Sequence, residues 1–189
     1  MSRPRPQSPE RPLLRLVASQ SEAELPPDPR NFDAVFRRYS PYVARVGLRL
    51  LGSENELDDL VQEVFIEAHR GLETVREPAA VRGWLARICV RRAVRRLRRH
   101  RLRAVLSLDS LPDAVLPAQS GTSPEQAAEV AAVYRILGRM SAMERVIWVL
   151  RHVEGESLDD IASICESSKS TVQRRLRTAQ ARFEQEVSP

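Results

Sequence analysis

One stretch in the middle of the chain, residues 84–103 (W-L-A-R-I-C-V-R-R-A-V-R-R-L-R-R-H-R-L-R), restricts what the sequence can fold into. In and just before it, apolar residues recur at steps of three and four, the spacing of one buried helix face: Val81, Trp84, Leu85, Ile88, Val94 and Leu97. Nine arginines and no acidic residue occupy positions 87–103. Clustered arginines neutralise phosphates and release their counterions, so this helix is predicted to bind nucleic acid. The alternative is a solvated basic face without a ligand.

Composition favours helices in the rest of the chain as well. Aromatic residues make up 5% of the sequence and only 7 of the 189 residues are glycine, a balance that favours helices over sheets. The net charge of +5 is concentrated, because residues 31–103 contain sixteen bases and nine acids and so carry +7. We therefore predict an all-α protein, long enough for two small helical domains.

The cysteines and histidines indicate neither a metal site nor a catalytic site. Cys89 and Cys165 lie far apart, without a C-x-x-C motif or a histidine at ligand spacing, so no metal and no cofactor are expected. His69, His100 and His152 are scattered, and no nucleophile with its base can be recognised, so an enzyme is not expected. No apolar run is long enough to insert into a membrane, which predicts a cytoplasmic protein with buried, reduced thiols.

The first part of the chain divides into a tail and a helical domain. Residues 1–30 contain seven prolines among mixed charges and are predicted to be a disordered tail. The domain at 31–103 begins with a helix over 31–51, in which Pro41 is expected to cause a kink or a break. A capping box at 53–56 (S-E-N-E) predicts the start of a second helix, and Pro78 suits the first turn of the arginine-rich third helix.

The second part of the chain is predicted to be a linker and another helical domain. Residues 104–124 lack a helical period and read as a flexible linker. The domain at 125–187 has capping boxes at 123–126 and 141–144, a helix end at Gly155 and a short helix opening at Ser157. A turn at Glu166 then leads to a long helix over 168–186. A short helix, a turn and a longer basic helix indicate a DNA-binding helix-turn-helix, although an ordinary helical hairpin has the same outline.

Together these segments resemble the bacterial RNA polymerase sigma factors, specifically the two-domain extracytoplasmic-function group. The resemblance rests on D-D-L-V-Q-E-V-F (58–65) and W-L-A-R-I (84–88) in the first domain. In the second it rests on R-V-I-W-V-L-R-H-V-E-G-E-S-L-D-D-I-A (145–162) and T-V-Q-R-R-L (171–176). It implies a factor without catalytic activity that directs core RNA polymerase to promoters and assists promoter opening. Such factors are commonly held inactive by an anti-sigma protein, which the sequence does not identify.

The resemblance also implies roles for individual residues. The helix that binds the clamp helices of the largest polymerase subunit is matched by Asp59, Gln62 and Glu63. The part that opens the downstream "minus ten" promoter element is matched by Trp84, Arg87, Arg91, Arg95, Arg98 and Arg99. The surface that reads the upstream "minus thirty-five" element as duplex is matched by Lys169, Thr171, Gln173, Arg174, Arg175, Arg177 and Thr178. The alternative function is a helix-turn-helix regulator that binds DNA without replacing sigma.

The chain departs from the family pattern at four of its positions. Arg91 stands where the family usually has Asn, and Arg95 where it often has Asp. Because Arg can only donate hydrogen bonds, recognition of the downstream element is expected to differ. Glu166 and Ser170 replace glycines of the helix-turn-helix, which is tolerable if the backbone there stays at negative φ.

Overall fold

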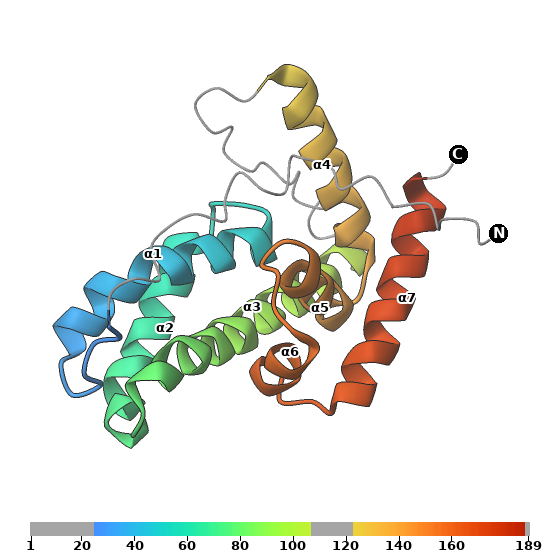
Figure 1. Ribbon diagram of the computed structural model, residues 1–189. Coiled ribbons are helices and arrows are strands. Elements are labelled where there is room, and N and C mark those ends of the chain that lie inside the picture. The colour runs from blue at the N-terminus through green and yellow to red at the C-terminus, as the bar shows by residue number, and fades with distance from the viewer. Residues whose placement is uncertain (1–24, 107–122, 188–189) are drawn as a thin grey trace.

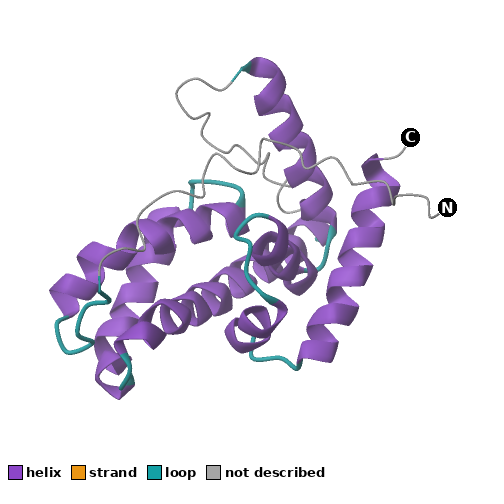
Figure 2. Cartoon of the chain, viewed as in Figure 1, coloured by secondary structure: helices purple, strands orange, loops and turns teal. Residues whose placement is uncertain are grey.

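The expected all-α fold is confirmed by the computed structural model, which describes residues 25–106 and 123–187 (Figures 1 and 2). The helices are α1 (Phe32–Leu51), α2 (Leu57–Gly71), α3 (Val81–Val105), α4 (Pro124–Arg139), α5 (Ala142–His152), α6 (Leu158–Ile164) and α7 (Lys169–Val187). Two 3₁₀ turns, η2 (Leu72–Thr74) and η3 (Pro78–Ala80), join α2 to α3. Most of the predicted tail and linker, residues 1–24 and 107–122, lies outside the described ranges.

The first unit is a three-helix arrangement of α1, α2 and α3, each of which packs on the other two. The Asn31 side chain caps α1 by accepting a hydrogen bond from the Ala34 N–H. Pro41 does not split α1, contrary to one of the two outcomes expected. Its ring lies on the exposed side, while Tyr42 and Val43 beside it are buried and keep the helix attached to the core.

The capping box predicted at residues 53–56 is wrong. Residues 53–56 form a turn, and α2 begins at Leu57 with Glu56 as an N-cap that makes no side-chain capping bond. The Ser53 hydroxyl instead accepts from the Asn55 N–H at 3.3 Å. The first turn of α2 therefore depends on Asp58 and Asp59, whose negative charges are favourable at a helix N-terminus.

Capping in the second unit follows the sequence closely. The Ser123–Gln126 and Ser141–Glu144 pairs both form complete capping boxes, at the starts of α4 and α5. Ser157 caps α6 by accepting from the Asp160 N–H. Gly155 adopts φ +74, a conformation that suits glycine, three residues after the end of α5.

The two units pack against each other in this structure. In Figure 1, α5 and α6 lie against α3, and α7 covers their other side. The buried apolar residues of both units form one continuous core. All six consecutive residues from Arg145 to Leu150 of α5 are buried, so this part of the helix is covered on every side, because α5 is central in the packed molecule. Cys89 and Cys165 are buried, and their burial raises the pKa of both thiols to about 12.

Candidate functional site

The predicted downstream-DNA residues share one side of α3. At 3.6 residues per turn, Trp84, Arg87, Arg91, Arg95, Arg98 and Arg99 fall within about a third of the helix circumference. Arg95, Arg98 and Arg99 are exposed, and none has a hydrogen bond or ion pair within the described residues. Trp84 is half-buried against Gly71, where a Cβ would come within 3.1 Å of the indole. The outer part of this side is therefore free to contact phosphates.

Three arginines of α3, including Arg91 of the predicted downstream-DNA set, are paired with carboxylates of α2. Glu67 accepts hydrogen bonds from Arg91 and, at 2.7 Å, from Arg92. Arg96 donates two hydrogen bonds to Glu63, at 3.0 and 3.2 Å, and its side chain is only 6% exposed. These pairs join α2 to α3, so part of the basic run is structural. The sequence shows that Glu63 and Glu67 lie one helical turn apart on the same side of α2. It does not show which arginines of α3 face them.

Glu63, one of the three residues predicted to bind core polymerase, therefore pairs with α3 while its side chain stays 41% exposed. The hydrogen bond from Arg96, with the charges of Arg96, Arg92 and Arg99, lowers the pKa of Glu63 despite an opposing effect of partial burial. Asp58, Asp59 and Gln62 do face outward and are exposed. Within the described residues, Asp59 and Gln62 have no hydrogen-bond or ion-pair partner, which leaves them available to another protein.

An apolar groove between α1 and α2 runs beside these exposed residues. It is lined by Phe32, Phe36, Ser40, Pro41, Ala44, Asp58, Val61, Gln62, Phe65, Ile66, His69 and Arg70. Phe36 is 42% exposed, and Ile66 is 47% exposed. The Phe36 and Phe65 rings meet edge to face at 4.7 Å. The sequence missed this groove, because apolar spacing does not distinguish a core-facing residue from one at the mouth of a groove.

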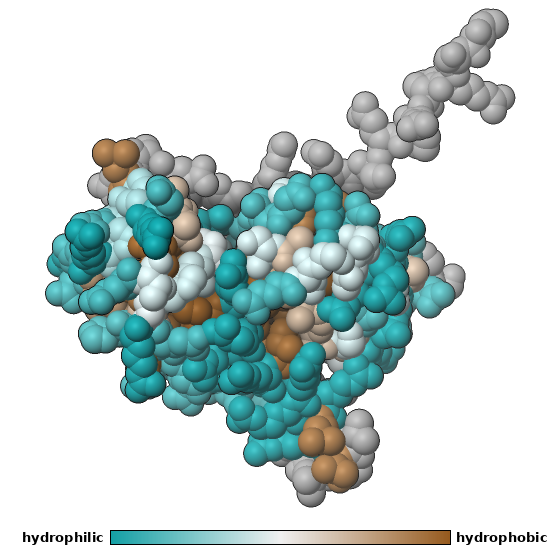
Figure 3. Space-filling view, turned by 90° about the horizontal axis from the view of Figure 1, so that it is seen from below, coloured by the Kyte–Doolittle hydropathy of each residue, from teal (hydrophilic) through white to brown (hydrophobic). Residues whose placement is uncertain are grey.

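Three arginines of α3 contact the second unit, and the first of them, Arg82, donates a hydrogen bond to Glu156 at 2.7 Å. Arg87 donates to the Ser163 hydroxyl at 3.3 Å and lies 3.9 Å from the Glu166 carboxylate. Arg101 donates to the Met140 carbonyl at 3.2 Å. Arg87 was predicted to contact downstream DNA, and in this arrangement the helix-turn-helix occupies it instead. Figure 3 views the molecule from below and shows that hydrophilic side chains dominate this face, with smaller hydrophobic patches between them.

The helix-turn-helix predicted in the second unit is present as α6, a turn and α7. Glu166 in the turn has φ +50, so the condition under which its replacement of a glycine would be tolerable is not met. A left-handed conformation is costly for a residue with a Cβ, and Glu166 therefore occupies a glycine-like position under strain. The backbone is held by hydrogen bonds from the Glu166 and Ser167 N–H groups to carbonyls of α6. The Ser168 hydroxyl accepts from the Thr171 N–H and so caps α7.

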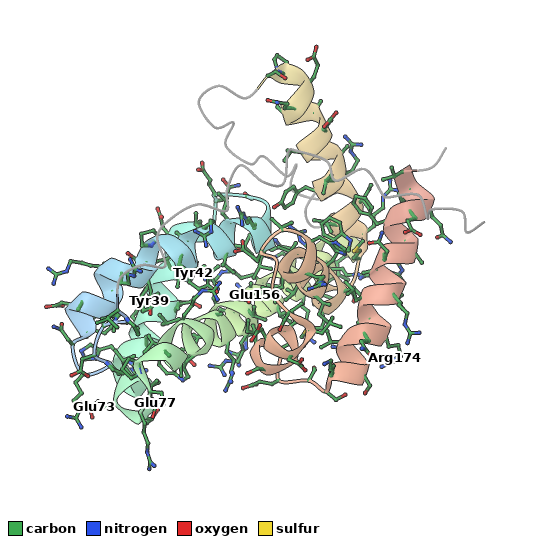
Figure 4. All side chains as sticks on the ribbon, in the orientation of Figure 1. Tyr39, Tyr42, Glu73, Glu77, Glu156 and Arg174 are labelled. Carbon is green, nitrogen blue, oxygen red and sulfur yellow. The ribbon has the colours of Figure 1, made fainter. Side chains whose placement is uncertain are left out.

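The predicted upstream-DNA residues lie mostly on the outer side of α7. Gln173, Arg174, Arg177 and Thr178 are exposed, and Figure 4 shows Arg174 pointing away from the molecule. Thr171 and Arg175 are half-buried, and Lys169 forms an ion pair with Asp159 of α6 at 2.8 Å. The inner side of α7 is apolar, with Val172 and Ala179 fully buried. The packing of the two units thus leaves the outer side of α7, which holds most of the predicted upstream-DNA residues, exposed.

Two sequence families match this chain, one for each helical unit. Sigma-70 region 2 matches residues 35–103, and Sigma-70, region 4 matches residues 131–182. These two regions, in this order, define the class as a sigma-70-type factor.

Among the described residues no group of three or more His, Cys, Asp or Glu side chains is placed to hold a metal ion. None of the helices in the described ranges has the length and apolar character needed to span a membrane.

Individual relatives narrow the class further. The ECF RNA polymerase sigma factor SigM of Mycobacterium tuberculosis is 32% identical over 152 residues, which are 80% of this chain and 74% of the relative. The ECF RNA polymerase sigma-E factor of Haemophilus influenzae is 30% identical over 174 residues, covering 86% of this chain and 90% of the relative. This chain belongs to the ECF RNA polymerase sigma factors, which function in transcription initiation.

The arrangement of the helices also has a solved counterpart. The sigma factor RpoE from Bartonella quintana, crystallised with the anti-sigma factor NepR, is similar with a TM-score of 0.65. The similarity covers 85% of this chain and 99% of that chain at 22% identity, so it concerns the fold.

Proposed function

We propose that the chain binds core RNA polymerase through the exposed side of α2 and contacts promoter DNA through α3 and α7. Asp59 and Gln62, with the neighbouring apolar groove, form the proposed polymerase contact. Trp84 and the exposed arginines of α3 form the proposed contact to the downstream element, and the outer side of α7 the contact to the upstream element. The factor has no catalytic activity of its own in this proposal and works in the cytoplasm. An anti-sigma protein is a proposed further partner, by analogy with the B. quintana complex.

The observation that carries this proposal is the presence of one acidic surface and two separate basic surfaces on one chain. The α2 side offers Asp58, Asp59 and Gln62, whereas the outer sides of α3 and α7 offer arginines without carboxylate partners among the described residues. An acidic protein-binding side next to two basic sides suits a factor that sits between a protein and DNA. The direct test is transcription in vitro with purified core polymerase on genomic fragments. The proposal requires start sites that depend on this chain, and their absence would contradict it.

Arg98→Ala with Arg99→Ala is expected to weaken DNA binding uniformly across sequences. Both side chains are exposed and unpaired within the described residues, as phosphate contacts should be. Each lost phosphate contact should reduce the slope of log affinity against log salt by about 0.7 to 0.9. The measurement is fluorescence anisotropy of labelled single-stranded and duplex promoter DNA between low and moderate salt. An unchanged slope would make these residues part of a solvated face.

Arg174→Ala with Arg177→Ala is expected to weaken binding to a preferred upstream duplex by at least about tenfold. Each guanidinium is exposed on the outer side of α7, and one specific base contact is worth roughly 1–3 kcal/mol. Binding to random duplex should fall less, which separates base reading from phosphate contact. Arg135→Ala on exposed α4 is the control. Equal losses on specific and random DNA would remove these residues from sequence recognition.

A further inference from the structure

Two acidic residues after α5 are almost completely buried between the two helical units. Glu154 and Glu156 flank Gly155, and their side chains are 4% and 9% exposed. Gly155 adopts φ +74 between them, and the Glu156 N–H donates to the Leu150 carbonyl at 2.9 Å. This turn directs both carboxylates toward the first unit. Burying a carboxylate costs free energy unless it is paired with a positive charge, so the contacts of both residues decide whether they stabilise the interface.

The first unit provides an arginine partner for each carboxylate. Glu154 is paired with Arg49 of α1 and lies 3.8 Å from Arg45 of the same helix. Glu156 accepts a hydrogen bond from Arg82 of α3 at 2.7 Å. The Arg45 and Arg82 guanidinium groups also lie over the Tyr42 ring, at 5.5 and 4.6 Å from its centroid. Figure 4 shows Tyr42 and Glu156 close together at this junction.

The rest of the interface is close-packed but incompletely hydrogen-bonded. Tyr134 of α4 donates to the Arg49 carbonyl at 3.0 Å, and a Cβ on Gly52 would come within 2.5 Å of its ring. Four arginine N–H groups near this junction are buried without a hydrogen-bond partner: Arg45 Nε, Arg87 Nε, and Nε and Nη2 of Arg145. Unsatisfied buried donors cost free energy, which makes the contact suited to reversible opening.

The packed arrangement cannot contact both promoter elements at once. The elements named "minus ten" and "minus thirty-five" are about 25 base pairs apart, which is roughly 85 Å at 3.4 Å per base pair. α3 and α7 pack on opposite sides of α5 and α6, so their axes are separated by only about 20 Å. Residues 107–122 are covalently long enough to allow a much larger separation, at up to about 3.3–3.6 Å per residue. The units must therefore separate on a promoter.

We propose that Glu154 and Glu156 are a latch that holds the free chain closed, and that releasing them from the arginines of α1 and α3 opens it for promoter binding. The need for opening rests on the proposed function, whereas the latch itself concerns the free chain. Closure occupies Arg87 with the helix-turn-helix but leaves the outer side of α7 exposed. The closed chain is consequently able to bind upstream duplex but not to span both elements.

The test is small-angle X-ray scattering of the full chain without polymerase or DNA. Glu154→Gln with Glu156→Gln keeps the side-chain shapes and removes the charges, and should raise the open-to-closed ratio on the order of a hundredfold. The radius of gyration should then rise by about 5 Å or more above a compact value near 16 Å for a chain of this length. Glu125→Gln with Glu129→Gln, at exposed positions on α4, is the matched control and should not change it.

A second pair of variants keeps the test decisive. If the double Gln variant loses its helical circular-dichroism signal, Arg49→Gln with Arg82→Gln tests the same latch from the other unit. A radius of gyration unchanged in a folded latch variant overturns the latch. If opening occurs but no factor-dependent transcription is found, the latch stands and the proposed function fails. In transcription assays the open variant should reach half-maximal output at a lower concentration, by at least about tenfold, because it no longer has to open first.

Discussion

Replacing Asp59 and Gln62 together with arginine is expected to abolish binding to core RNA polymerase. Both side chains are exposed beside the apolar groove of α1 and α2 and have no partner among the described residues. Asp59→Arg reverses a charge and Gln62→Arg adds one; mismatched charges at a protein interface cost several kcal/mol, so affinity should fall at least about a hundredfold. Titration of labelled chain with core polymerase measures the loss directly, and factor-dependent transcription should fall with it.

The control for this pair is Glu125→Arg with Glu129→Arg on exposed α4, which makes a similar charge change away from the groove. Binding of the Asp59 and Gln62 variant at wild-type affinity would exclude this side of α2 as the polymerase contact. If the wild-type chain binds duplex DNA but never core polymerase, the helix-turn-helix regulator becomes the better description. Circular dichroism should show nearly unchanged helicity, because both side chains are exposed and Asp58 still supplies a negative charge in the first turn of α2.

Glu63→Ala is expected to lower the free energy of unfolding by about 2 kcal/mol. Arg96 is nearly buried, and removal of its carboxylate partner leaves an uncompensated charge between α2 and α3. Because the Glu63 side chain is 41% exposed and partly screened by water, the loss should lie between those of exposed and of buried pairs. Urea unfolding measures the difference, with Gln62→Ala as a neighbouring control that should change stability by less than about 0.5 kcal/mol.

The same variant predicts a pH dependence with a definite sign. The pKa of Glu63 is lowered in the folded chain, so its ionised form stabilises the fold above the pKa of the unfolded chain, near 4.3. That contribution is lost as pH falls through the lower folded pKa. The stability difference between wild type and Glu63→Ala should therefore be constant near neutral pH and shrink below about pH 4.3. A difference that does not change with acidification would assign the effect to packing.

The helices could be read from the sequence wherever local chemistry determined them. Ser123, Ser141 and Ser157 cap helices as predicted, because a hydroxyl and an N–H three residues later are sufficient. The capping box predicted at Ser53 does not form, because the same residue pattern also fits a turn. The position of α2 is set instead by the burial of Leu60 and Val64 in the core. The backbone conformation of Glu166 could not be predicted for a related reason. The connection from α6 to α7 requires a positive φ there, and the sequence indicated only that the residue is not glycine.

The residues of the candidate site could be predicted from the sequence, but the contacts that they make with other helices could not. The outward side of α7 and the exposed arginines of α3 follow from helical spacing, which the sequence displays. Which arginines of α3 are paired and which are free does not follow from helical spacing. It depends on whether Glu63 and Glu67 of α2 face α3. The pairing of Glu154 and Glu156 with α1 and α3 was equally hidden, because more than a hundred residues separate Glu154 from Arg49. Contacts between the two units arise from tertiary packing, which local sequence patterns do not predict.

The all-round burial of α5 gives the closed chain a thermal signature. Val146, Ile147, Val149 and Leu150 are shielded partly by their own unit and partly by the first. Separation of the units would bring part of this apolar surface into contact with water, and hydration of apolar surface raises the heat capacity. Burial of such surface stabilises less in the cold, whereas the ion pairs of Glu154 and Glu156 do not share that dependence. Cooling should therefore shift the free chain toward its open form before either unit unfolds.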